Sequence, residues 1–161
     1  MSLQKYESKV QHIAHPNASV YAVLSDFTRL KALGQLLQSE EYASLIEQRL
    51  GKEKAAGVAE KLREIELTED TAGINVPPVG TVTVRIVERE EPKLVKLAFE
   101  GLPVNAWIWL QLLPDENDGT RLKVTTGADV SFFLKGMADK YLSPMADNMA
   151  QILASLPYDK L

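Results

Sequence analysis

The two histidines of the chain, His12 and His15, are the first residues to consider as metal ligands or catalysts. A protein zinc site uses three or four ligands, and the sequence has no cysteine to add to this pair. Within a strand, their odd spacing also places the two side chains on opposite faces. We therefore expect no metal and no cofactor. Because an imidazole titrates near neutral pH, His12 can still act as a single acid or base.

The serines have no sequence context that would activate them as nucleophiles. Ser25 and Ser131 lie outside any Gly-x-Ser-x-Gly turn, and the chain has neither a phosphate-binding glycine loop nor a dinucleotide fingerprint. In an alternating strand, Tyr6 shares a face with His12. Enzymatic chemistry in this chain would therefore depend on polar groups drawn from His12, Tyr6 and Tyr141.

The composition is that of an ordinary globular protein. The chain has 161 residues, of which 45% are hydrophobic and 25% charged, and this length predicts a single domain over residues 1–161. A net charge of −4 disfavours a general nucleic-acid binder. No stretch approaches the roughly 18 apolar residues of a membrane span, and the polar start lacks the apolar core of a signal peptide. Together with the absence of cysteine, these features predict a cytoplasmic location.

The first part of the chain predicts a strand followed by short helices. Residues 3–13 alternate between two faces, as in a half-buried strand. Pro16 and Asn17 end this pattern and are suited to opening a helix, after which apolar residues at helical spacing predict two short helices up to about residue 37. Residues 39–63 have a helical pattern interrupted by glycines. We interpret them as a helical insertion of two short helices joined near Gly51.

From about residue 65 the hydrophobic pattern changes to a period of two, which predicts strands over residues 66–76, 81–90, 94–100, 105–113 and 121–130. Short polar turns between the strands predict antiparallel pairing. On strand 105–113, Trp107 and Trp109 alternate with aliphatic residues. We place both tryptophans on the outer face of the sheet, unless a bulge near Asn105 reverses the alternation and turns them inward.

The C-terminal stretch, residues 130–156, predicts one long helix. Its apolar face is spaced by three and four residues and consists of Leu134, Ala138, Tyr141, Met145, Met149, Ile152 and Leu156. About 25 helical residues span about 37 Å, enough to cross a sheet. Pro144 lies in the middle of this stretch, so the helix either kinks there or restarts with Ser143 as a cap. We favour a kink. A curved antiparallel sheet with its apolar face covered by this helix is an α+β architecture.

In this order of elements the chain resembles the START-related (SRPBCC) superfamily, which includes pollen-allergen-like and polyketide cyclase-like proteins. The resemblance is carried by the terminal helix and by the segments HIAHPNASVYAVLSDFTRL, VGTVTVRIVEREEPKLVKLAFEG and DGTRLKVTTGADV. It covers the chain except for residues 39–63. It implies a helix-grip fold, in which a curved antiparallel sheet of about six strands wraps around the long C-terminal helix, with two or more short helices after the first strand.

The resemblance also implies a cavity between the concave face of the sheet and the terminal helix that accepts an apolar small molecule. Carried onto this sequence by strand and helix positions, the predicted ligand-binding residues are Tyr6, His12, Val84, Leu97, Phe99, Val124, Thr126, Phe133, Met137, Tyr141, Met145 and Met149. The same side chains would equally suit a dry, fully packed core. The sequence alone leaves both interpretations open.

Three functional hypotheses follow from the sequence. The first is a small-molecule binding protein that holds an apolar ligand between the sheet and the C-terminal helix. The second is an enzyme of the cyclase or dehydratase kind, using polar groups in the same cavity. The third is a self-associating interaction module, forming a homodimer through the face that carries Trp107 and Trp109. The family hosts carriers and enzymes alike, so the resemblance does not decide between them.

Overall fold

The computed structural model describes residues 2–36, 38–76, 80–131 and 135–161. The strands, in chain order, are β1 (Ser2–Glu7), β2 (Gln11–Ile13), β3 (Glu66–Leu67), β4 (Thr71–Val76), β5 (Gly80–Glu90), β6 (Leu94–Glu100), β7 (Asn105–Pro114) and β8 (Thr120–Val130). The helices are α1 (Asn17–Leu24), a 3-10 helix η1 (Phe27–Arg29), α2 (Leu30–Leu36), α3 (Glu40–Leu50), α4 (Lys52–Glu64) and α5 (Lys135–Ala154).

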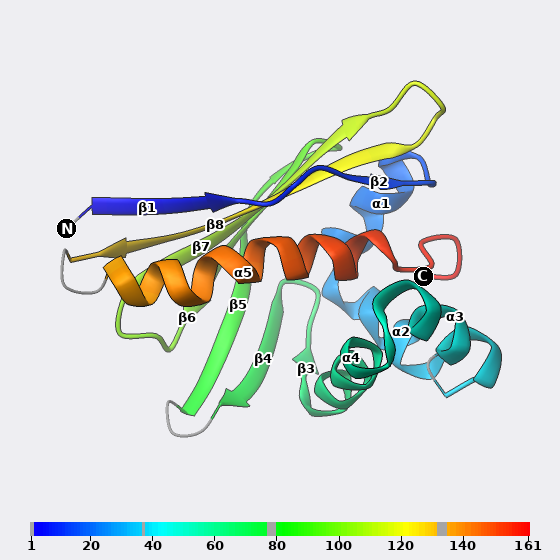
Figure 1. Ribbon diagram of the computed structural model, residues 1–161, viewed down its shortest axis with the longest axis horizontal. Coiled ribbons are helices and arrows are strands. Elements are labelled where there is room, and N and C mark those ends of the chain that lie inside the picture. Colours follow the sequence, from blue (N-terminus) through cyan, green and yellow to red (C-terminus); the bar gives the residue numbers. More distant parts are fainter. Residues whose placement is uncertain (1, 37, 77–79, 132–134) are drawn as a thin grey trace.

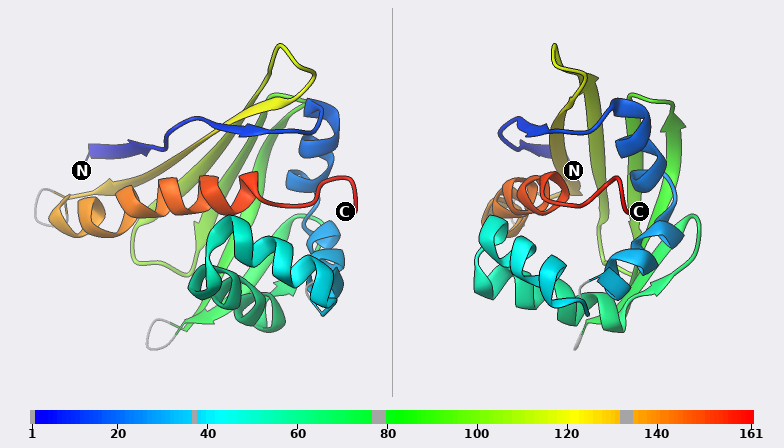
Figure 2. Two further views of the ribbon diagram at one scale, coloured as in Figure 1. Left: turned by 45° about the vertical axis from the view of Figure 1, so that its right-hand side comes forward. Right: turned by 90° about the vertical axis from the view of Figure 1, so that its right-hand side faces the viewer.

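All the strands form one antiparallel sheet in the order β1-β8-β7-β6-β5-β4-β3, and β2 also pairs with β8 (Figure 1). Helix α5 lies along the concave side of this curved sheet, and α3 and α4 lie beside α5 near the β3 edge (Figure 2). Polar contacts join these helices: the Lys54 ammonium donates to the Gln151 side-chain oxygen over 2.7 Å, and Arg49 donates to the Ser155 carbonyl over 3.4 Å. The predicted α+β class, with a sheet gripping a C-terminal helix, is confirmed.

The first strand is divided in two by one extra residue. Glu7 lies opposite Thr125, and Gln11 lies opposite Leu122. The chain therefore advances four residues from Glu7 to Gln11 while β8 advances only three. Ser8 spans the irregularity, because its N–H donates to the Val124 carbonyl over 2.8 Å and its hydroxyl accepts the Val124 N–H over 2.9 Å. A one-residue bulge exchanges the faces of all side chains beyond it. The prediction of one continuous strand over residues 3–13 was therefore wrong.

The predicted strand 66–76 is also divided, into β3 and β4. The Thr68 N–H donates to the Thr71 carbonyl over 2.9 Å, and the Thr71 N–H donates to the Thr68 hydroxyl over 3.0 Å. Threonine hydroxyls commonly stabilise tight turns in this way. These two divisions explain why the described sheet has eight strands where the sequence predicted about six. The predicted strands from residue 81 onward match β5 to β8 to within one residue at each end.

The short helices form where the sequence predicted them. Helices α3 and α4 are joined at Gly51, which has a φ of 87°. Only glycine adopts that backbone conformation without strain. The Gly51 N–H closes α3 on the Glu47 carbonyl over 2.8 Å, and the Gly51 carbonyl accepts the Ala55 N–H over 3.0 Å at the start of α4. The predicted pair of helices within residues 39–63 is thus confirmed.

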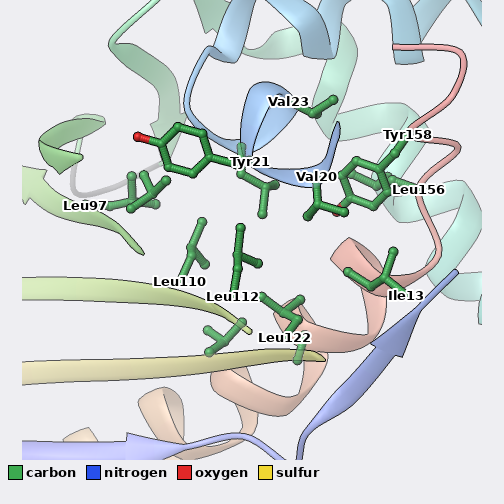
Figure 3. Close-up of a cluster of buried hydrophobic side chains, with 14 of the residues drawn as sticks. Ile13, Val20, Tyr21, Val23, Leu97, Leu110, Leu112, Leu122, Leu156 and Tyr158 are labelled. Carbon is green, nitrogen blue, oxygen red and sulfur yellow. The ribbon is translucent and has the colours of Figure 1, made fainter. Parts of the chain in front are cut away.

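Two hydrophobic clusters hold these layers together. The main core joins α1, β2, the central strands, α5 and the C-terminal tail (Figure 3), and its largest fully buried members include Val20, Ile108, Leu112, Leu122 and Val124. A smaller cluster of Ala106, Ala128, Val130 and Ala138 lies at the other end of α5. Phe99 contacts both clusters and so bridges them. Tyr158 in the tail is buried, and its hydroxyl donates to the Leu153 carbonyl, which secures the chain after α5.

Helix α5 is continuous from Lys135 to Ala154, with Pro144 inside it. This excludes the alternative in which a second helix restarts at Ser143, while the kink stays a prediction. The hydroxyl of the buried Thr126 on β8 donates to the Leu142 carbonyl over 2.8 Å. This hydrogen bond holds α5 against the sheet within one helical turn of Pro144. Within the described residues, no helix is long and apolar enough to cross a membrane.

Candidate ligand-binding site

The sheet residues predicted to bind a ligand lie on the concave face. Leu97 and Val124 are buried in the main core, and the partly buried Val84 and Phe99 pack against it. Thr126 is fully buried, but its hydroxyl is already bonded to α5. The placement of these five residues is therefore as expected. Their role in ligand binding stays a prediction, because the same contacts also make them part of a packed core.

The helix residues divide into two groups. Met149 packs against the main core and Met145 is half-buried, whereas Met137 and Tyr141 are 57% and 59% exposed. The expected interior placement of Met137 and Tyr141 was wrong. Phe133 lies outside the described residues.

Met137 and Tyr141 are exposed because α5 is rotated about its axis so that another side of the helix faces the sheet. The buried positions of the helix are alanines, at Ala138, Ala146 and Ala150. The facing strand β8 already supplies bulky side chains, including Leu122 and Val124. Small residues allow a helix to approach such a surface closely, and the larger apolar residues then lie at the edges of the contact or in solvent.

The polar residues predicted for catalysis are not brought together. The Tyr6 hydroxyl donates to Asp139 on α5, and desolvation, followed by this hydrogen bond and the charge of Asp139, raises the pKa of Tyr6 to about 12. The His12 side chain is 69% exposed, and its Nδ1 lies 3.4 Å from Asp115 Oδ2 on the β7–β8 turn. Tyr141 points outward beside Lys140, whose ammonium lies 5.5 Å from the ring centre. The expected interior positions of His12 and Tyr141 are both wrong, and for His12 the cause is the bulge at Ser8.

The described residues provide no obvious place for a metal. Within the part of the chain that the structure describes, no three His, Cys, Asp or Glu side chains converge. The carboxyl of Asp115 has a pKa below its usual range, chiefly because it accepts the Asn117 N–H over 2.7 Å. The Asp115 carboxylate therefore stays ionised at the surface of the turn, where it contacts the His12 side chain.

A pocket of about 290 Å³ lies between α2, α4 and the edge strand β3. Its apolar surface comes from small and aliphatic residues: Leu30, Gly34, Ala59, Ile65 and Leu67. Leu30 and Leu67 also pack against the main core, so the floor of the pocket is continuous with the interior of the protein. Of the twelve residues predicted from the sequence, none of the eleven that the structure describes lines this pocket.

Polar side chains surround this apolar floor. They are Lys31, Gln35 and Gln38 from the α2 side and Arg63 from the end of α4. All four are exposed, so their polar ends reach solvent at the opening. The pocket therefore combines an apolar base with a polar, positively charged rim. This is the common chemistry of small-molecule sites, in which a few polar groups orient a largely apolar ligand.

Sequence reasoning missed this pocket because its walls are distant in the chain. The one local signal was Gly34, a glycine within the apolar pattern of α2. A Cβ built at Gly34 meets no atom within 4 Å, so the helix surface is open at that point. Ala59 on α4 contributes a second small side chain to the same space.

Solved structures match this chain over nearly its full length, although no family model and no curated protein matches the sequence. Norcoclaurine synthase from Thalictrum flavum in complex with dopamine and hydroxybenzaldehyde has a TM-score of 0.62 at 14% identity, covering 99% of this chain and 89% of that one. A point mutant of the same enzyme with a transition state analogue gives a TM-score of 0.62 at 15% identity, covering 95% and 92%. A protein of unknown function from Staphylococcus aureus gives 0.56 at 11% identity, covering 96% and 91%.

At these identities the likeness concerns the fold. This chain has a helix-grip fold, in which a curved antiparallel sheet wraps around the C-terminal helix, like that of these solved structures. These structural matches each cover 95% or more of the chain. The resemblance seen in the sequence is therefore confirmed at the level of architecture.

The outer face of this helix-grip sheet carries both tryptophans. The alternate residues of β7, Ala106 to Leu112, pack inward, so Trp107 and Trp109 lie outside, as favoured from the sequence. Their rings are 6.3 Å apart, and the ammonium groups of Lys5 and Lys96 lie 4.6 Å and 5.4 Å from the Trp109 ring. Lysines thus cover this aromatic pair within one chain. The homodimer through this face stays a prediction.

Proposed function

We propose that this helix-grip protein binds a small apolar molecule in the pocket between α2, α4 and β3. The observation that carries the proposal is the apolar floor of that pocket, where Leu30 and Leu67 contact the main core on one side and open space on the other. A volume of about 290 Å³ is close to the lower limit of roughly 300 Å³ for small-molecule sites. The ligand is therefore expected to be small.

Fold similarity supports the same proposal. The matching norcoclaurine synthase structure is a complex with dopamine and hydroxybenzaldehyde, which are small aromatic molecules. A protein of this architecture can therefore bind ligands of about the size that the pocket admits. The proposed site differs from the sheet–α5 contact expected from the sequence. At that contact, Leu97 and Val124 are packed in the core, whereas the residues around the pocket leave space.

The test is a pocket-filling substitution with a matched control. Gly34→Leu places a side chain into the pocket, while Gly57→Leu places the same side chain on α4, where no atom lies within 4 Å of the added Cβ and no pocket residue is replaced. Both exchanges replace a helical glycine and should favour the helix by a similar amount, about 1 kcal/mol. Neither should therefore unfold the protein.

The probe is the uncharged fluorophore N-phenyl-1-naphthylamine, titrated into each purified protein. We expect saturable binding to the wild type and to Gly57→Leu, and at least tenfold weaker binding to Gly34→Leu. If Gly34→Leu binds the probe as the wild type does, or if the wild type does not bind it, this pocket is not the site. Backbone amide shifts in ¹⁵N-labelled protein, at Gly34, Ala59 and Leu67, locate the bound probe independently.

A further inference from the structure

The charge of the pocket rim differs from that of the chain as a whole. The protein has 22 acidic and 18 basic residues and a net charge of −4. Among the described residues that line the pocket, two are cations, Lys31 and Arg63, and none is Asp or Glu. An anion approaching the protein from a distance is therefore repelled on average, and only the local lining favours it.

The two cations are also available to a ligand. Within the described part of the chain, the ion pairs involve other bases, and neither Lys31 nor Arg63 takes part in one. An arginine guanidinium presents paired N–H donors that match a carboxylate, and a lysine adds a mobile point charge. The amides of Gln35 and Gln38 supply further donors at the same opening.

We propose that the ligand is an amphipathic carboxylate, whose apolar part occupies the floor formed by Leu30 and Leu67 and whose carboxylate lies at the rim between Lys31 and Arg63. This rests on the proposed function and deepens it, because it assigns the chemical class of the ligand. The geometry gives each part of such a molecule a matching surface: apolar against the core, anionic toward the two cations and solvent.

The experiment compares two probes of equal chain length, octanoate and 1-octanol, by ¹⁵N chemical-shift titration at pH 7 and low salt. An apolar pocket without charge selection should favour the alcohol, because a carboxylate is more costly to remove from water. We expect the wild type to bind octanoate three- to tenfold more tightly than octanol, the size of effect that two exposed ion pairs can give. High salt should remove this preference and leave octanol binding unchanged.

The variant Lys31→Gln/Arg63→Gln should lose the preference for octanoate while binding octanol within about twofold of the wild type. Lys52→Gln/Lys93→Gln is the control, since it changes the net charge equally at exposed positions away from the pocket. If both variants keep the preference, or if the wild type shows none, the carboxylate is not the determinant. If neither probe shifts Gly34, Ala59 or Leu67, the proposed function itself fails. The salt dependence of the wild type tests the inference without any substitution.

Discussion

The contact between Trp109 and Gly127 predicts how the outer face of the sheet responds to one added methyl group. The Trp109 ring lies directly on the backbone of β8 at Gly127, and a Cβ built at Gly127 would be 2.8 Å and 3.2 Å from two ring carbons and 3.3 Å from the Gln4 carbonyl oxygen. Carbon atoms in contact are normally separated by about 3.5–4.0 Å. Gly127→Ala therefore forces the ring to move off the sheet.

The expected cost is that of overpacking, about 1–3 kcal/mol of unfolding free energy. For a chain of this size, 2 kcal/mol corresponds to a Tm lower by about 4–8 °C. The backbone at Gly127 does not have a positive φ, so alanine brings no strain of its own. The loss of stability therefore comes from the clash between the alanine Cβ and the Trp109 ring. Thermal unfolding followed by circular dichroism, with urea unfolding at an unchanged m-value, measures it.

The decisive comparison is made in a Trp109→Val background. With the ring absent, only the contact to the Gln4 carbonyl is tight, and replacing glycine by alanine reduces the entropy of the unfolded chain. The cost of Gly127→Ala should then fall to within about 0.5 kcal/mol of zero, or change sign. An equal cost in both backgrounds would show that the ring does not lie on Gly127 in solution, and the account of this outer face would be refuted.

Three further outcomes follow from buried or shielded hydroxyls. Thr126→Val should lower the free energy of unfolding by about 0.5–1.5 kcal/mol, because it removes the hydrogen bond to the Leu142 carbonyl. Thr126→Ser should keep that bond and serves as the control. Equal stability of the valine variant and the wild type in urea unfolding would contradict this prediction. The pKa of Tyr6 should fall from about 12 in Asp139→Asn but stay above 10.0, because burial is the larger cause. Because the pKa of Tyr6 is raised in the folded protein, the stability that Tyr6 contributes is complete below pH 10.0 and is lost as the pH rises toward 12. A ¹³C-tyrosine NMR titration measures the pKa, and a comparison of the alkaline unfolding of the wild type and Tyr6→Phe measures the stability. In thermal unfolding, Tyr158→Phe should lower the free energy of unfolding by about 0.5–1.5 kcal/mol, because it removes the hydrogen bond to Leu153. Tyr158→Ala should lower it by about 3–5 kcal/mol, because it also removes a buried ring. An unaffected alanine variant would show that the tail is not part of the core.

The elements that could be predicted from the sequence are those fixed by local pattern. Strands β5 to β8 alternate clearly and end at turn-forming residues, so both their positions and their antiparallel pairing could be inferred. The glycine at Gly51 likewise marks the junction of α3 and α4, because its φ of 87° excludes other residues without strain.

The features that were missed depend on contacts between distant segments. Nothing near Ser8 shows that its hydroxyl will accept the Val124 N–H, yet that contact accompanies the bulge and turns His12 outward. Hydrophobicity alone ranks Met137 and Tyr141 above the alanines of α5, but the space left by β8 decides which side of the helix is buried. The pocket has the same origin, since α2 and α4 meet only in the folded chain.

The bulge at Ser8 also sets how this edge of the sheet responds to changes in chain length. Deleting one residue from 8–10 would join β1 and β2 into a regular strand with Gln11 still opposite Leu122, whereas deleting two would turn Ile13 to solvent and His12 to the interior. The loss of two residues would thus place an imidazole where an aliphatic side chain now completes the core. Changes of residue type at Lys9 or Val10, which are exposed, leave the pairing as it is. This segment should therefore tolerate variation in the side chains of Lys9 and Val10 and the loss of one residue, but not the loss of two.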